Sequence, residues 1–142
     1  MGYRATVAFI LVLAVGNVVG MCANHSVASE QVKTIDYDTF GKLDLQGRHK
    51  VLNEISPENM AEIMKTHVKR WLEKNRNHLS QEQISVLEES ITSITADSYR
   101  FPRSNEAMKR AKELAAKAAA VFSQEEMVQA LTLDGDYIPP QK

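Results

Sequence analysis

The clearest pattern in the chain is a run of apolar residues at helical spacing that begins at Pro57. Apolar residues recur three and four positions apart, and charged residues occupy the positions between them. This period is that of one face of an α-helix and not the alternation of a strand. The pattern therefore predicts an amphipathic helix that ends in the stretch 75–77. Its apolar face consists of Met60, Ile63, Met64, His67, Val68, Trp71 and Leu72.

A repeated start signal opens this helix and two others. In residues 55–60, 79–84 and 122–127, an apolar residue, a serine, a polar-acidic stretch and a second apolar residue follow in that order. The serine can accept a hydrogen bond from a free amide of the first turn, and the acidic residue lies at the positive end of the helix dipole. Gln83 and Glu126 complete capping boxes. The three copies predict three helix starts.

The rest of the chain also favours helices. A helix is predicted from about Asp38 to Glu54, although Gly41 and Gly47 weaken it. The other predicted helices run from the second start signal to near residue 97, from 105 to 120 and from 124 to 133. No segment alternates long enough to predict a strand. We therefore predict an all-α fold, a small bundle of about five helices.

Two segments are predicted to be non-helical. Residues 98–104 form the longest loop, since Pro102 disfavours helical geometry at Phe101. Tyr99 and Phe101 in this loop are expected to pack onto the core rather than to form an exposed site. Residues 137–140, with two consecutive prolines, are expected to form an extended tail.

Residues 1–28 have the pattern of a secretory signal peptide. Arg4 precedes an apolar run that is shorter than the about 20 residues a spanning helix needs. Small residues at the end of this segment place the cleavage site after Ala28. A second possible site follows Ala23. The alternative is that the segment is not cleaved and serves as an N-terminal anchor. We therefore expect an exported protein, secreted or periplasmic, whose residues 29–142 form a single helical domain with an extended C-terminal tail.

Cys22 is the only cysteine in the chain. A bacterial lipoprotein is cut just before a lipid-carrying cysteine at such a position, but Met21 stands where that pattern needs a small residue. Lipidation of Cys22 is therefore the less favoured option. If cleavage follows Ala28, the mature chain has no cysteine and cannot rely on disulfides for stability.

Composition excludes some classes of protein. The 142 residues include 17 Lys and Arg against 18 Asp and Glu, a net charge of −1, which argues against a nucleic-acid binder. Apolar residues make up 44% of the chain, enough for a packed core. The length indicates one domain.

The sequence offers no recognisable catalytic constellation. His67 lies on an apolar helix face with no second histidine or carboxylate four residues further on, so we expect a hydrogen-bonded core residue and not a metal ligand. The chain has no glycine-rich phosphate loop and no nucleophile elbow. We therefore expect a non-catalytic protein without a cofactor or metal, and the residues indicate no small-molecule substrate.

Basic residues cover the polar side of the helix that begins at Pro57. The favoured interpretation is a solvated face, and the alternative is contact with a target protein or an anionic membrane surface. The candidate contact residues are Lys65, Lys69, Arg70, Lys74 and Arg76. The alanine-rich helix carries a similar set, Lys109, Arg110, Lys112 and Lys117.

The order of the motifs resembles that of the bacteriocin fulvocin C-related proteins. The resemblance covers about residues 50–133. It is carried by the Ser-Pro-Glu start at Ser56, the helix with Met64, His67 and Trp71, the Leu-Ser-x-Glu-Gln start at 79–83, and the alanine-rich helix that closes on Phe-Ser-x-Glu-Glu at 122–126. It implies a secreted protein, related to a myxobacterial bacteriocin, that acts in bacterial competition.

A second similarity is to the LTxxQ element of periplasmic stress chaperones of the Spy and CpxP type. Residues 79–83 match this element with serine in place of threonine, and they form one copy where those proteins normally carry two. This similarity implies a periplasmic chaperone or an envelope-resident binding protein. The first hypothesis predicts growth inhibition of a related strain, and the second predicts protection of a client protein from aggregation.

Overall fold

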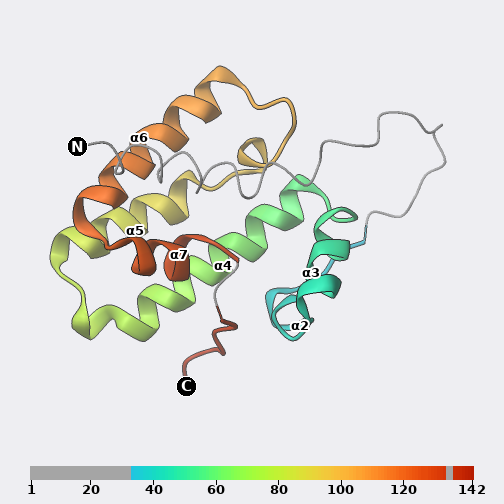
Figure 1. The fold of residues 1–142 in the computed structure, drawn as a ribbon, viewed down its shortest axis with the longest axis horizontal. Helices are drawn as coiled ribbons and strands as arrows, with labels where there is room; N and C mark the ends of the chain where they lie inside the picture. The colour runs from blue at the N-terminus through green and yellow to red at the C-terminus, as the bar shows by residue number, and fades with distance from the viewer. Residues whose placement is uncertain (1–32, 134–135) are drawn as a thin grey trace.

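A computed structural model describes residues 33–133 and 136–142 of the chain (Figure 1). Within these residues the chain forms six α-helices, two short 3-10 turns and no strand, which confirms the predicted all-α fold. The predicted signal peptide and Cys22 lie outside the described residues. In chain order the elements are α2 (Tyr37–Gly41), α3 (Leu45–Leu52), α4 (Pro57–Asn75), η1 (Arg76–His78), α5 (Gln81–Ser93), η2 (Ala96–Ser98), α6 (Asn105–Val121) and α7 (Gln124–Leu131).

Each α-helix of this part of the chain begins with a side-chain cap. A serine or aspartate just before the helix accepts a hydrogen bond from the amide of the third helical residue. The capping residues are Asp36, Asp44, Ser56, Ser80, Ser104 and Ser123. The three starts predicted from the repeated signal are confirmed, including the capping boxes with Gln83 and Glu126.

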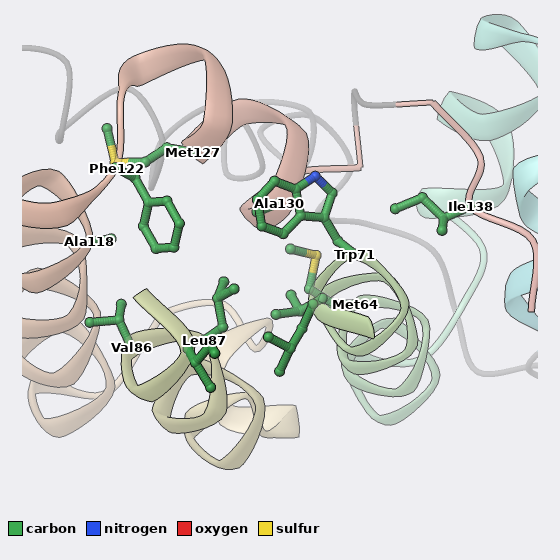
Figure 2. Packing of buried hydrophobic residues seen from close by; sticks show 12 residues of the cluster. Met64, Trp71, Val86, Leu87, Ala118, Phe122, Met127, Ala130 and Ile138 are labelled. Atoms are coloured by element: carbon green, nitrogen blue, oxygen red, sulfur yellow. The ribbon is translucent and has the colours of Figure 1, made fainter. Parts of the chain in front are cut away.

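Helix α4 lies between two hydrophobic clusters. The larger cluster joins α4 to α5, α6 and α7, and Val68 and Trp71 are among the α4 residues in it. The ring of Trp71 meets that of Phe122 edge-on, with 6.2 Å between their centroids (Figure 2). The smaller cluster joins Ile63 of α4 to Phe40 of α2 and Val51 of α3. In Figure 1, α2 and α3 accordingly lie to one side of α4, away from α5 and α6.

The predicted single helix from Asp38 to Glu54 is wrong, because the structure has two short helices there. Helix α2 ends at Gly41, and the carboxylate of Asp44 then accepts a hydrogen bond from the Gly47 amide 2.7 Å away to start α3. The aspartate cap competes with helix continuation, since it satisfies the free amides of a new first turn. The chain can therefore bend and bury Phe40 and Val51 in one cluster.

The loop after α5 differs from its prediction in two respects. Helix α5 ends at Ser93, several residues before the predicted end, and the 3-10 turn η2 follows. Tyr99 packs against the larger cluster as expected, whereas Phe101 is 81% exposed, so its predicted core position is wrong. Ion pairs of Arg100 with Asp97 and Glu58 hold this part of the loop on the polar surface.

The C-terminal tail packs against α2 and α4. Ile138 is buried in the larger cluster, and its carbonyl accepts a hydrogen bond of 3.0 Å from Arg70. The Tyr137 ring lies over Gly41, and its hydroxyl donates to Asp38. A Cβ atom at Gly41 would lie 2.9 Å from Cγ of Tyr137 and closer still to Cδ2. The glycine that weakened the helix prediction thus makes room for the tail.

Gly41→Ala tests this close approach. Alanine is favoured over glycine in a helix by about 0.5–1 kcal/mol, but here its methyl group overlaps an aromatic ring. We expect the substitution to lower the free energy of unfolding by about 1–3 kcal/mol in urea titrations. In a Tyr137→Ala background the same change should be neutral or stabilising. An equal loss in both backgrounds would contradict the packing role of Gly41.

Candidate functional site

A cleft of about 170 Å³ lies between α4, α5, α6 and the loop that joins α5 to α6. Met60 and Met64 form its α4 wall, and Leu131 lines it from the end of α7. Helix α6 contributes mostly alanine side chains, among them Ala111 and Ala115. The lining is therefore largely apolar, which is the usual character of a small-molecule site.

The cleft follows from the small residues of α6. The sequence of this helix is rich in alanine. At its C-terminal end Ala118 and Phe122 are buried in the larger cluster, so α6 is closely packed there. Ala111 and Ala115 instead line the cleft, because a methyl group is too short to fill the space opposite the α4 methionines. Met108 at the other end is exposed.

Charged side chains also line the cleft. Arg103 and Arg110 line it, and so does Asp97, whose carboxylate accepts a hydrogen bond of 3.1 Å from Arg100. Arg110 lies 3.5 Å from Glu106 and is half exposed. The charged side chains that line the cleft therefore already interact with other groups of the protein.

Tyr99 also lines the cleft, and its hydroxyl has no hydrogen-bond partner in the described structure. Since no fully buried side-chain oxygen among those residues lacks a partner, this hydroxyl must keep access to open space. Burial of the ring raises the pKa of Tyr99 well above its ordinary value. The hydroxyl therefore stays protonated at neutral pH and can donate a hydrogen bond.

The five basic residues predicted as a surface contact do not face one neighbour. Lys65 pairs with Glu62 on its own helix, and Arg76 pairs with Glu88 of α5 at 3.0 Å. Lys69 and Lys74 are exposed. The polar face of α4 is thus partly used in contacts within the protein.

Arg70 belongs to the internal structure. Its side chain is 15% exposed, and its guanidinium binds both carboxylate oxygens of Asp38, at 2.6 and 3.1 Å. The same group donates to the carbonyl of Ile138 and lies 5.0 Å from the centroid of the Tyr37 ring. Arg70 and Tyr137 hold the pKa of Asp38 far below its ordinary value. Periodicity placed Arg70 on the polar face, but could not show that α2 and the tail cover it.

His67 is 1% exposed and hydrogen-bonded at both ring nitrogens, which confirms the predicted core role. Nε2 lies 2.8 Å from the carbonyl oxygen of Gln129, and Nδ1 lies 2.7 Å from the hydroxyl of Tyr37. A carbonyl can only accept, so Nε2 carries the proton in the neutral ring and Nδ1 accepts from Tyr37. One imidazole thus joins α2, α4 and α7.

No other site stands out in residues 33–133 and 136–142. No group of three or more His, Cys, Asp or Glu side chains in these residues could hold a metal ion. No helix in the same residues is both long and apolar enough to cross a membrane. Comparison with protein-family models, curated proteins and solved structures finds no match to the chain.

The buried imidazole should make stability fall in mild acid. Burial and the charge of Arg48 lower the pKa of His67 from its ordinary value of 6.5, although the bond to Gln129 opposes this. In mild acid the unfolded chain therefore binds a proton at His67 that the folded chain does not bind. The His67 contribution is complete above pH 6.5 and decreases as pH falls below it, by at most about 1.4 kcal/mol per pH unit.

Urea titrations between pH 7.5 and 5 check this slope. His67→Gln should flatten it and lower stability at pH 7.5 by about 1–3 kcal/mol, since one buried hydrogen bond is lost. His49→Gln is the control, because His49 is exposed. If the free energy of unfolding depends on pH in the same way in the His67 variant and the unmodified protein, another titrating group must cause the loss of stability in acid.

Proposed function

We propose that this protein is an exported, non-catalytic binding protein that holds a small apolar ligand in the cleft between α4, α5 and α6. The observation that carries the proposal is the cleft itself, with methionines on one wall and alanines on the other. Methionine side chains adapt to ligands of different shape because they are unbranched and flexible. Export is supported by the signal-peptide pattern of residues 1–28.

The polar groups of the cleft favour binding over catalysis. The hydroxyl of Ser90 donates to the carbonyl of Val86 at 2.7 Å, so it is engaged within its own helix. No histidine or lysine is among the described residues that line the cleft, and the one carboxylate among them, that of Asp97, is already paired with Arg100. The Tyr99 hydroxyl can donate a hydrogen bond to a ligand in the cleft.

The proposal keeps the binding-protein hypothesis drawn from the sequence but adds a small ligand, which the residues alone did not indicate. Residues 79–83, which resemble the chaperone element, form the start of α5, and the Gln83 amide donates to the carbonyl of Val121 at 2.9 Å. A structural role therefore accounts for this element without a client. The chaperone role and a role in bacterial competition each rest on resemblance alone and stay predictions.

Binding of N-phenyl-1-naphthylamine, a neutral apolar fluorophore, tests the proposal. The unmodified protein, expressed with residues 1–28 and purified from the exported fraction, should enhance its fluorescence with a saturable one-to-one curve. Ala111→Phe places a ring in the cleft and should weaken binding at least about tenfold, because the ligand and the ring compete for one volume.

Ala116→Phe is the matched control. Ala116 lies on the same helix but is exposed and outside the cleft, so the helix propensity changes equally in both variants. Thermal melts should show both variants folded. Absence of saturable binding to the unmodified protein, or equal binding by both variants, would rule out the cleft as an apolar site.

A further inference from the structure

The volume and the lining of the cleft limit the chemistry of its ligand. We propose that the cleft binds a neutral compound of about the size of one substituted ring, with a hydrogen-bond acceptor that meets the Tyr99 hydroxyl. This inference rests on the proposed function and adds the chemical class of the ligand.

The size of the cleft sets the size of the ligand. Its volume is about 170 Å³, and an engineered protein cavity of about 150 Å³ holds one benzene molecule. Met60 and Met64 of α4 line the cleft, and a thioether makes favourable contacts with an aromatic ring. The cleft can therefore cover one ring with a short substituent, whereas part of a larger compound would extend into solvent.

The charged side chains of the cleft favour a ligand without charge. The Asp97 carboxylate accepts a hydrogen bond of 3.1 Å from Arg100, and Arg110 lies 3.5 Å from Glu106. Arg103 also has an interaction within the protein. A charged ligand would therefore lose its hydration in a largely apolar cleft, while each charged group among the described lining residues already has a partner. A neutral ligand avoids this cost.

The Tyr99 hydroxyl offers the ligand a polar contact. Tyr99 directly follows the turn η2 and its ring packs against the larger cluster, so the fold sets the position of this side chain. Its hydroxyl has no hydrogen-bond partner among the described residues. The Ser90 hydroxyl, which also lines the cleft, already donates to the Val86 carbonyl. A ligand oxygen can accept from Tyr99 without breaking a hydrogen bond inside the protein.

Displacement of N-phenyl-1-naphthylamine by three compounds of nearly the same shape tests the charge and size of the ligand. Acetophenone is neutral and carries a carbonyl acceptor, benzoate is an anion, and benzamidine is a cation at neutral pH. Acetophenone should displace the fluorophore at a concentration about tenfold or more below that of either ion, because only the ions lose the hydration of a full charge. Equal or better displacement by either ion, or none by acetophenone, would overturn the proposal.

Tyr99→Phe tests the hydrogen bond, with ethylbenzene as the reference compound that lacks an acceptor. The variant keeps the ring and removes the hydroxyl. The concentration of acetophenone needed for displacement, divided by that of ethylbenzene, should therefore rise several-fold. Tyr137→Phe is the matched control, because it removes a hydroxyl that does not line the cleft, and it should keep the ratio of the unmodified protein.

The outcomes separate this inference from the proposed function. An unchanged ratio in Tyr99→Phe would overturn the assignment of the ligand's acceptor to Tyr99. Failure of N-phenyl-1-naphthylamine itself to bind would instead overturn the proposed function.

Discussion

Helix α4 has apolar residues on two sides, and the rest of the structure covers both of them. One side packs against α5 and α7 and the other against α2, and the C-terminal tail contributes Ile138 to the first cluster and Tyr137 to the second. His67 introduces a buried polar group between them, and leaving such a group unpaired would cost about 1–3 kcal/mol. The Tyr37 hydroxyl and the Gln129 carbonyl satisfy it, so the positions of α2 and α7 depend on this residue.

Side-chain size divides the bundle into a packed end and an open end. Near Trp71, the methyl group of Ala118 and the ring of Phe122 fill the space between helices (Figure 2). Toward the start of α6, its alanines and the methionines of α4 leave space between the two helices, and this space is the cleft. The cleft is thus a consequence of using alanine along α6, and the core at the other end keeps the helices fixed around it.

The sequence predicted the features that depend on neighbouring residues. The apolar face of α4 and the start of α5 at Ser80 were predicted because periodicity and capping are local. The break before α3 was missed, since the cap at Asp44 was not weighed against the helical pattern around it. The exposure of Phe101 depends on which surface its loop covers, and that is decided by helices distant in the chain.

The candidate site was harder to predict for the same reason. Arg110 was noted as part of a solvated face and Tyr99 as a core contact, and neither pattern shows that the two residues line one cleft. Met60 and Met64 were predicted on the apolar face of α4, and both are buried as well as lining the cleft. The available signal was the alanine-rich run paired with a methionine-rich face, which predicts close packing and a gap equally well.

The most direct measurement is an amide ¹H–¹⁵N NMR titration of the labelled protein with N-phenyl-1-naphthylamine. If the cleft is the binding site, saturable chemical-shift changes should concentrate at residues 94–115 and around Met60 and Met64. The packed contacts on the other side of α4 should give no response. The amide chemical shifts near His67, Gly41 and Tyr137 should therefore stay unchanged. Shifts spread evenly over the surface, or concentrated on the exposed lysines of α4, would contradict a ligand site in the cleft.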